Sequence, residues 1–212
     1  MTKPLPCMIK KFLVGGNWKL NGNLKLLKEF SSNKNFIEAV ECSSEAIEVL
    51  ICPAFPFLGT AKEAFAGSSI SIGAQNCHAA PSGAFTGESE EQREKGETNQ
   101  ILESQLEECL ESLKSLNGVD CERLVIAYEP VWAIGTGKVA SPQQAQETHH
   151  HIRQFLADKI SPEHASAFRI IYGGSVSGTS AVELAKQVDI DGFLVGGASL
   201  KVDEFTKIIK SI

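Results

Sequence analysis

The 212-residue sequence predicts a parallel α/β fold, in which strands and helices alternate along the chain. Six short apolar runs are rich in β-branched residues and too short to favour helix. Segments with helical spacing separate these runs, and most runs end in glycine, proline or asparagine, as strands do before a turn. The predicted strands include residues 12–14, 49–51, 70–72, 124–126, 169–172 and 193–195.

The helical segments carry recognisable start signals. Ser141 precedes Pro142 and is followed three positions later by Gln144, so both members of a capping box are present. Ser180 and Glu183 repeat this spacing, which predicts a second cap at Ser180. A third helix is indicated by apolar residues spaced to share one face. These residues are Ile101, Leu102, Leu106, Leu110, Leu113 and Leu116.

Composition indicates an ordinary globular protein, with 42% hydrophobic residues, 22% charged residues and a net charge of −6. We expect residues 1–212 to form a single domain, since the chain is long enough for one well-buried core. The absence of a basic block argues against a nucleic-acid partner. No apolar stretch has the length of a membrane span, and residues 1–11 are too polar for a signal peptide. We therefore expect a cytoplasmic protein.

The cysteines and histidines give no sign of a metal site. The six cysteines are scattered without metal-ligand spacing, which predicts reduced thiols. The histidines are interpreted as surface residues, with His164 in a loop. His149, His150 and His151 are consecutive, and adjacent helical positions do not share a face. The cysteine and histidine pattern therefore predicts no metal site.

A glycine-rich turn, GGNWKLNG at residues 15–22, follows the first predicted strand directly. A lysine in such a loop can reach over the mouth of a parallel sheet or barrel, where active sites gather. Lys19 is therefore a candidate for binding an anionic substrate. The alternative is a surface lysine in a strand–helix connection.

The segment YEPVWAIGTGK, residues 128–138, places Glu129 at the end of an apolar run and follows it with a glycine-flanked loop. This arrangement is typical of a base held on a rigid strand beside a mobile flap. The apolar residues 131–133 predict partial burial of Glu129. The alternative is an ordinary surface glutamate at a strand end.

Two further glycine-rich turns follow the last two predicted strands. Gly173-Gly174-Ser175 ends one strand, and Gly196-Gly197-Ala198-Ser199 ends the next. Glycines let backbone N–H groups approach an anion closely, so the pair of turns indicates a phosphate site. Either turn taken alone is also consistent with a simple tight turn.

Taken together and in this order, these strings resemble the triosephosphate isomerase family, whose fold is the TIM (β/α)8 barrel. The resemblance implies interconversion of dihydroxyacetone phosphate and glyceraldehyde 3-phosphate through an enediolate, in glycolysis and gluconeogenesis, without cofactor or metal. It implies that Glu129 is the base, that Asn17 and Lys19 bind substrate, and that residues 133–137 form a lid. It also implies that the phosphate is held by Gly135, Ser175, Gly196 and Gly197.

Residues 75–88 resemble the family's long third loop, which reaches into a partner subunit. The resemblance implies a homodimer formed through this loop. The alternative is an ordinary exposed loop.

The resemblance is interrupted at Gly87-Glu88, where a strand, its helix and the next strand of the family are missing, together with the motif GHSERR. The histidine of that motif polarises the substrate carbonyl. We therefore expect an incomplete TIM barrel of about six βα units, with lower stability and impaired catalysis. The alternative function is an impaired or inactive truncated isoform that retains phosphate binding or pairs with a full-length subunit. A different phosphate-binding barrel enzyme is a third possibility.

Overall fold

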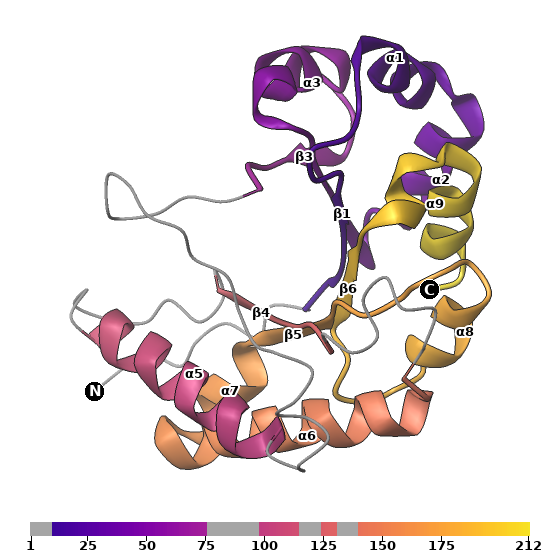
Figure 1. Cartoon of the computed structure of the whole chain (residues 1–212). Helices are drawn as coiled ribbons and strands as arrows, with labels where there is room; N and C mark the ends of the chain where they lie inside the picture. The colour runs from indigo at the N-terminus through magenta and orange to yellow at the C-terminus, as the bar shows by residue number, and fades with distance from the viewer. Residues whose placement is uncertain (1–9, 76–97, 115–123, 131–139) are drawn as a thin grey trace.

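Figure 1 shows the computed structural model, which describes residues 10–75, 98–114, 124–130 and 140–212. The strands are β1 (Phe12–Asn17), β2 (Ile47–Cys52), β3 (Ile70–Ile72), β4 (Val125–Tyr128), β5 (Arg169–Tyr172) and β6 (Gly192–Val195). The α-helices are α1 (Leu24–Ser32), α2 (Lys34–Ser43), α3 (Leu58–Ala64), α5 (Thr98–Lys114), α6 (Pro142–Lys159), α7 (Pro162–Ala167), α8 (Ser180–Leu184) and α9 (Val202–Lys210). Two 3₁₀ helices are η1 (Phe55–Phe57) and η3 (Gly197–Leu200).

The described strands form one parallel sheet in the order β3-β2-β1-β6-β5-β4. The first and last strands of the chain, β1 and β6, therefore lie side by side in its middle. Helices α1, α2, α3 and α9 cover the outer side of β1 to β3, and α5, α6 and α7 cover β4 and β5 (Figure 1). This is the α/β arrangement of a partial TIM barrel, as the sequence predicted.

The sheet curls strongly, as one ion pair demonstrates. Arg169 on β5 and Glu48 on β2 are separated in the sheet by β1 and β6, yet Arg169 Nη1 lies 2.6 Å from Glu48 Oε2. Side chains from non-adjacent strands can meet in this way only across the concave face of a curved sheet. The curvature brings the strand ends toward one another, which matters for any site built on them.

The middle of the sheet is the best-packed region. Val14 on β1 and Phe193 on β6 are fully buried, and Phe12 packs edge-on against Phe193 at 5.0 Å between ring centroids. Gly192 is needed here, because a Cβ at this position would lie 2.3 Å from the carbonyl oxygen of Leu13. A cluster of buried rings from the loop after β1 and from α1, α2 and α9 completes this side of the core. The rings belong to Trp18, Phe30, Phe36 and Phe205.

Arg153 on α6 ties the outer helices to the starts of the middle strands. Its guanidinium donates to Asp189 Oδ1 at 2.6 Å and to Asp191 Oδ2 at 2.7 Å. It also donates to the backbone carbonyls of Ala165 and Phe168. Asp191 in turn accepts from the backbone N–H of Ile170 on β5, so the ion pairs are continuous with the sheet.

Most of the predicted elements are confirmed, with small changes of boundary. The capping box is confirmed: Ser141 Oγ accepts from Gln144 N at 3.1 Å, and Gln144 Oε1 accepts from Ser141 N at 3.0 Å. The cap predicted at Ser180 is wrong. Ser180 is already inside α8, and its own N–H donates to Ser177 Oγ at 3.2 Å.

The surface interpretation of the histidines is wrong for His149, which is fully buried between α6 and the sheet. Its residue spacing placed it on a helix, but that spacing alone did not say which face of the helix meets the sheet. His164 lies in α7 and not in a loop. The thiols of Cys42 and Cys52 are free, as predicted.

Candidate functional site

The predicted site residues of the described chain follow the C-terminal ends of four adjacent strands. Asn17 is the last residue of β1, Gly196 follows β6, Ser175 lies three residues after β5, and Glu129 follows β4. The sheet order β1-β6-β5-β4 puts all four on one edge of the curved sheet. In parallel barrels and sheets this is the edge at which ligands bind.

The loop after β1 holds Lys19 in an unusual backbone conformation. Lys19 has φ of +52°, a left-handed geometry that is uncommon for residues other than glycine. Two hydrogen bonds fix it: Lys19 N donates to Asn17 Oδ1 at 2.9 Å, and Gln75 Nε2 donates to Lys19 O at 2.6 Å. Strain of this kind persists where the surroundings hold it, which is common at binding sites.

Gln75 lies beside the candidate site, and its contacts within this chain were missed by the sequence analysis. Its side-chain amide donates both to the Lys19 carbonyl and to the Cys52 carbonyl, at 2.6 Å and 3.1 Å. It thereby links the loops that follow β1 and β3 to the last residue of β2. Its place at the start of the string AQNC was a usable signal, but the resemblance pointed to contacts with a partner subunit and not to contacts within this chain.

Trp18 anchors the loop after β1 on its buried side. Its side chain is buried, and its backbone N–H donates to Cys52 O at 3.1 Å. Gly22 closes the turn with φ of +99°, and a Cβ there would lie 2.9 Å from the Trp18 ring. The glycine is therefore required by both backbone geometry and close packing, and the exposed Lys19 projects from a rigid base.

Glu129 lies directly against the backbone of the next strand. A Cβ on Gly173 would lie 2.6 Å from Glu129 Cγ, so glycine at this position makes room for the carboxylate-bearing side chain. Gly173 N donates to Tyr128 O at 2.7 Å, which fixes the β4 end against β5. The predicted partial burial of Glu129 is wrong, since the residue is exposed. Its strand, β4, is the last strand of the described sheet and has a neighbour on one side only.

Tyr172 is a second residue whose importance the sequence analysis did not identify. It is fully buried at the end of β5, and a Cβ on Gly174 would lie 2.2 Å from its hydroxyl oxygen. Burial, together with the neighbouring Tyr128, raises the pKa of Tyr172 to about 12. The phenol therefore stays protonated at neutral pH, and Gly174 is required to accommodate it. The sequence analysis interpreted the string YGGS from its glycines alone and gave its tyrosine no role.

The glycines after β6 are in different surroundings. A Cβ on Gly196 or Gly197 would meet no atom of the described residues within 4 Å. The turn itself is firm, because the buried Ser199 donates from Oγ to Gly196 O at 2.7 Å. Space beside a glycine backbone lets an anion approach its N–H groups closely.

Several predicted features lie outside the described residues: Gly135, the lid at 133–137, His78 and all of the loop 75–88 beyond Gln75. Across the described ranges, no group of three or more histidine, cysteine, aspartate or glutamate side chains is arranged to hold a metal ion. In the same ranges, no helix is both long and apolar enough to cross a membrane.

Sequence comparison gives matches over almost the whole chain. The sequence profile of the triosephosphate isomerase family matches in two parts, residues 12–90 and residues 87–212. The chloroplastic triosephosphate isomerase of Fragaria ananassa is 40% identical over 249 residues, covering 95% of this chain and 78% of that protein. The triosephosphate isomerase of Zygosaccharomyces bailii is 37% identical over 256 residues, covering 96% of this chain and 99% of that protein. The cytosolic triosephosphate isomerase of Stellaria longipes is 39% identical over 253 residues, covering 97% of both.

The comparisons also locate a difference from these relatives. The two matched parts of the family profile meet at residues 87–90, where the sequence analysis placed the missing stretch. Each alignment is longer than the chain itself: the 249 aligned positions of the first exceed the 212 residues of this chain by 37. That relative therefore carries at least 37 residues that have no counterpart here.

Proposed function

The chain belongs to the triosephosphate isomerase family, and from this membership we propose that it interconverts dihydroxyacetone phosphate and glyceraldehyde 3-phosphate. The supporting observation is the common edge of the sheet. Asn17 ends β1, and Glu129, Ser175 and Gly196 follow three further adjacent parallel strands, which supports a shared site for a carboxylate, backbone amides and the lysine loop.

In this proposal Glu129 is the base. It removes the proton from the carbon beside the substrate carbonyl and returns it to the neighbouring carbon, with an enediolate between the two transfers. Its contact with Gly173 holds the side chain beside the end of β5. A base fixed on a strand end loses little freedom when substrate binds, which favours proton transfer.

Lys19 and Asn17 complete the reacting end of the site. The Lys19 ammonium offsets the negative charge that develops on the substrate oxygen as the enediolate forms. Asn17 fixes the loop through its hydrogen bond to Lys19 N. The constrained backbone of Lys19 means that little reorganisation is needed during the reaction.

The phosphate is assigned to Ser175, Gly196 and Gly197, with Gly135 joining from the lid. The open space over Gly196 and Gly197 supports this assignment. The substrate phosphate then lies near β5 and β6, between Lys19 on one side and Glu129 on the other. No metal or cofactor takes part in the proposed reaction.

Steady-state kinetics on the purified chain tests the proposal. Because the histidine that polarises the carbonyl is missing, we expect turnover on the order of 10²–10³ below that of a complete relative. Glu129→Gln lowers the remaining turnover by about 10²–10⁴, the usual contribution of a general base. The matched control is Glu147→Gln, an exposed glutamate on α6. Turnover that is unchanged in Glu129→Gln contradicts the assignment of the base.

We further propose that the chain forms a homodimer through the loop 75–88. Exposed apolar side chains support this: Leu20 is 94% exposed and Phe55 is 83% exposed, in the loop after β1 and in η1 after β2. Leu20 follows Lys19, and Phe55 lies three residues after Cys52, the two residues whose carbonyls Gln75 binds. Sedimentation velocity is expected to show a dimer that Phe55→Lys dissociates, whereas a monomer at all concentrations would rule this assembly out.

Two broader proposals concern the chain as a whole. We propose that residues 1–212 form one domain, since β1 and β6 from opposite ends of the chain share the sheet. We propose a cytoplasmic location, in keeping with the cytosolic relative. Limited proteolysis that releases two stable fragments would contradict the first proposal, and cell fractionation tests the second.

A further inference from the structure

The sheet has one seam, the place between β3 and β4 where it is not continuous. Strands that follow one another along the chain are neighbours in β1–β2, β2–β3, β4–β5 and β5–β6, and β6 returns to β1. Among the described strands, only the consecutive pair β3 and β4 is not joined. Both strands lie to the left of β1 and β6 in Figure 1, at the two ends of the curled sheet.

The backbone groups that face the seam follow from the observed hydrogen bonds. Gly73 N donates to Ile51 O on β2, and Tyr128 O accepts from Gly173 N after β5. Successive residues of a strand point their backbone groups to opposite sides. Ile70 and Ile72 of β3, and Val125 and Ala127 of β4, therefore direct their N–H and C=O groups away from β2 and β5, their described neighbours in the sheet. The Ile70 N–H already donates to Ser68 Oγ at 3.4 Å, so Ile70 can offer the seam its carbonyl.

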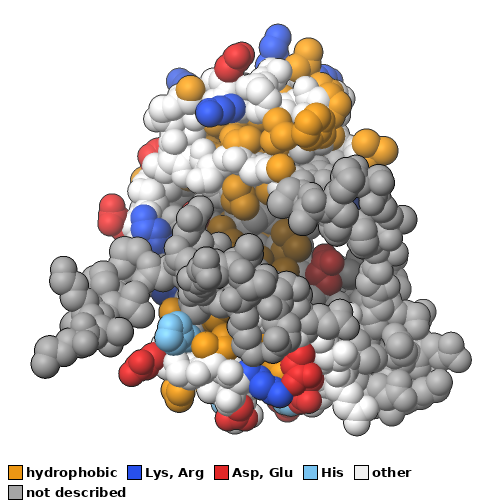
Figure 2. All heavy atoms as spheres, turned by 90° about the vertical axis from the view of Figure 1, so that its left-hand side faces the viewer, with side chains coloured by type: hydrophobic (Ala, Val, Ile, Leu, Met, Phe, Trp, Pro, Cys, Tyr) orange, Lys and Arg blue, Asp and Glu red, His pale blue; other side chains and the backbone are white. Residues whose placement is uncertain are grey.

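The side chains at the seam also indicate a missing neighbour. β4 consists of Val-Ile-Ala-Tyr, which is apolar on both faces, a pattern typical of strands buried inside parallel sheets. Val125 and Ile126 are nevertheless half-buried, and Ala127 is exposed. Figure 2 looks onto the left-hand side of Figure 1, where apolar side chains of the described residues are visible.

The comparisons indicate what fits there. The family profile is interrupted at residues 87–90, which lie in the chain between β3 and β4. The Fragaria ananassa relative has at least 37 residues more than this chain over the aligned region. A strand–helix–strand unit takes about 30 residues or more, so the additional stretch has the length of one such unit.

We propose that the seam is a docking site for a separate polypeptide that adds two parallel strands joined by a helix. One strand pairs with β3 through Ile70 and Ile72, and the other pairs with β4 through Val125 and Ala127. Because both edges run in the same direction, a single strand–helix–strand segment satisfies both at once. The interaction is β-strand addition at an exposed sheet edge, and it does not depend on catalysis.

A binding experiment tests this with a defined probe. The probe is the segment of the Stellaria longipes enzyme that aligns to no residue of this chain around positions 87–90, synthesised with a fluorescent label. Fluorescence anisotropy on titration with the purified full chain is expected to show saturable binding, with a higher melting temperature of the complex. A probe of the same composition in scrambled order is expected not to bind.

Ala127 provides a matched pair of variants. Ala127→Pro removes the N–H that faces the seam, and proline is tolerated on an edge strand. Ala127→Ser keeps that N–H and nearly the same size. We expect Ala127→Ser to bind the probe as the parent chain does, and Ala127→Pro to bind it about tenfold more weakly or worse. Near-UV circular dichroism checks that both variants keep the parent fold.

Two outcomes would overturn the proposal. The first is no saturable binding of the probe, and the second is equal binding to the parent and to a folded Ala127→Pro variant. None of these readouts uses isomerase activity, so failure here is distinguishable from failure of the proposed function.

Discussion

Strands β1 and β4 begin from similar residues but differ in their surroundings. Both contain short apolar runs, Leu13-Val14 in β1 and Val125-Ile126 in β4. In β1 these residues are buried, with β2 on one side and β6 on the other. In β4 they are half-buried, with β5 as the described neighbour on one side. The neighbours of a strand in a parallel sheet, and not its own composition, decide how completely it is buried.

The difference extends to the polar groups around each region. Arg153, at the starts of the middle strands, is held by two carboxylates and several carbonyls. Burial raises the pKa of Asp189, but hydrogen bonds from Arg153, Gln146 and His150 outweigh this and hold the pKa below its ordinary value. On the other side of α6, Lys159 pairs with Glu107 of α5, where both side chains are about half exposed.

The largest expected effect is at the middle of the sheet. Arg153→Ala removes the cation that Asp189 and Asp191 share, in a region where their side chains are 10% and 14% exposed. Asp191 keeps its ion pair with Lys10 at 2.7 Å, so the larger loss falls on Asp189. Removing one member of a buried ion pair costs about 3–5 kcal/mol. Urea denaturation followed by far-UV circular dichroism is expected to show this loss of free energy of unfolding.

Lys159→Ala is the matched control, on the same helix but toward α5. Water screens an exposed ion pair, so its contribution to stability is small and the urea midpoint is expected to stay close to that of the parent. Equal losses in the two variants would mean that the middle of the sheet is no better packed than its periphery.

The second prediction compares two isoleucines that are register partners on the neighbouring parallel strands β4 and β5. Ile170 of β5 is fully buried, and its partner Ile126 of β4 is half-buried. Ile170→Ala is expected to cost about 2–5 kcal/mol, the usual range for a buried isoleucine. Ile126→Ala is expected to cost about 1–2 kcal/mol, because part of its surface already contacts water.

The same two variants, Ile170→Ala and Ile126→Ala, can be compared again with the strand–helix–strand segment bound at the seam. A strand added beside β4 covers Ile126, so the cost of Ile126→Ala is expected to rise toward that of Ile170→Ala. The measurement is the same urea titration, repeated with a saturating concentration of the strand–helix–strand probe. An unchanged difference would mean that the added segment does not cover β4.

The sequence predicted much of this arrangement because the relevant signals are local. Apolar runs such as Ile70–Ile72 and Arg169–Tyr172 coincide with strands, and the capping box at Ser141 forms as its residue types require. The site residues Asn17, Lys19 and Glu129 stand in short strings with specific spacing. Their placement on one edge follows from parallel strands ending together.

The sequence could not predict properties that depend on tertiary neighbours. The exposure of Glu129 follows from the edge position of β4, which no residue near Glu129 encodes. Gln75 reaches loops distant in the chain, and Tyr172 is buried by residues from other elements. The failed cap at Ser180 has a different cause, since a competing Ser177 three residues earlier bonds to the Ser180 N–H.

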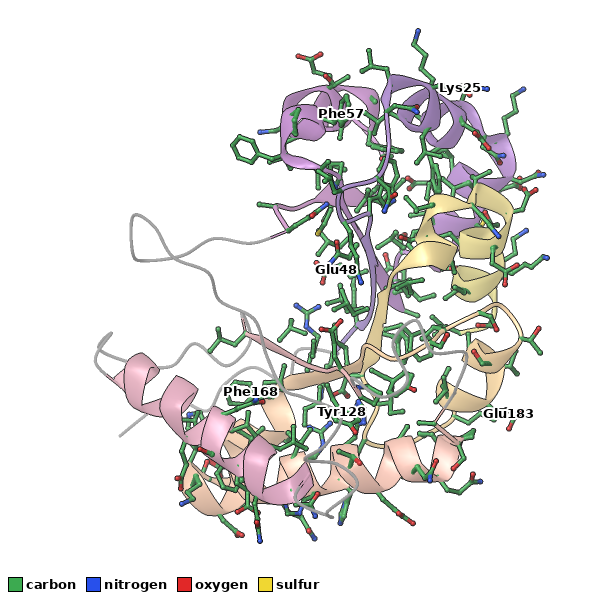
Figure 3. All side chains as sticks on the ribbon, in the orientation of Figure 1. Lys25, Glu48, Phe57, Tyr128, Phe168 and Glu183 are labelled. Atoms are coloured by element: carbon green, nitrogen blue, oxygen red, sulfur yellow. The ribbon has the colours of Figure 1, made fainter. Side chains whose placement is uncertain are left out.

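His149 packs against both β4, at the end of the described sheet, and β5 beside it. Its replacement has the smallest expected effect on the free energy of unfolding. Its ring lies 5.7 Å from that of Tyr128 on β4 and 6.1 Å from that of Tyr172 on β5, and Figure 3 shows Tyr128 between the sheet and α6. Its Nδ1–H donates to Ala145 O at 2.7 Å. Burial lowers the pKa of His149 below its ordinary value of 6.5, and the carbonyls of Ala145 and Ile171 offset this only in part.

The sign of the resulting pH dependence follows from proton binding. Below about pH 6.5 the unfolded chain takes up a proton on His149 that the folded chain does not, so the free energy of unfolding falls as the pH falls. One such group contributes at most about 1.4 kcal/mol per pH unit. His149→Gln is expected to reduce the loss of stability between about pH 7.5 and pH 5.5, measured by urea titration, whereas the exposed His150→Gln retains it. If His149→Gln keeps the full pH dependence, the His149 ring must reach water when it is protonated. The packing between β4 and α6 would then resemble the seam more than the middle of the sheet.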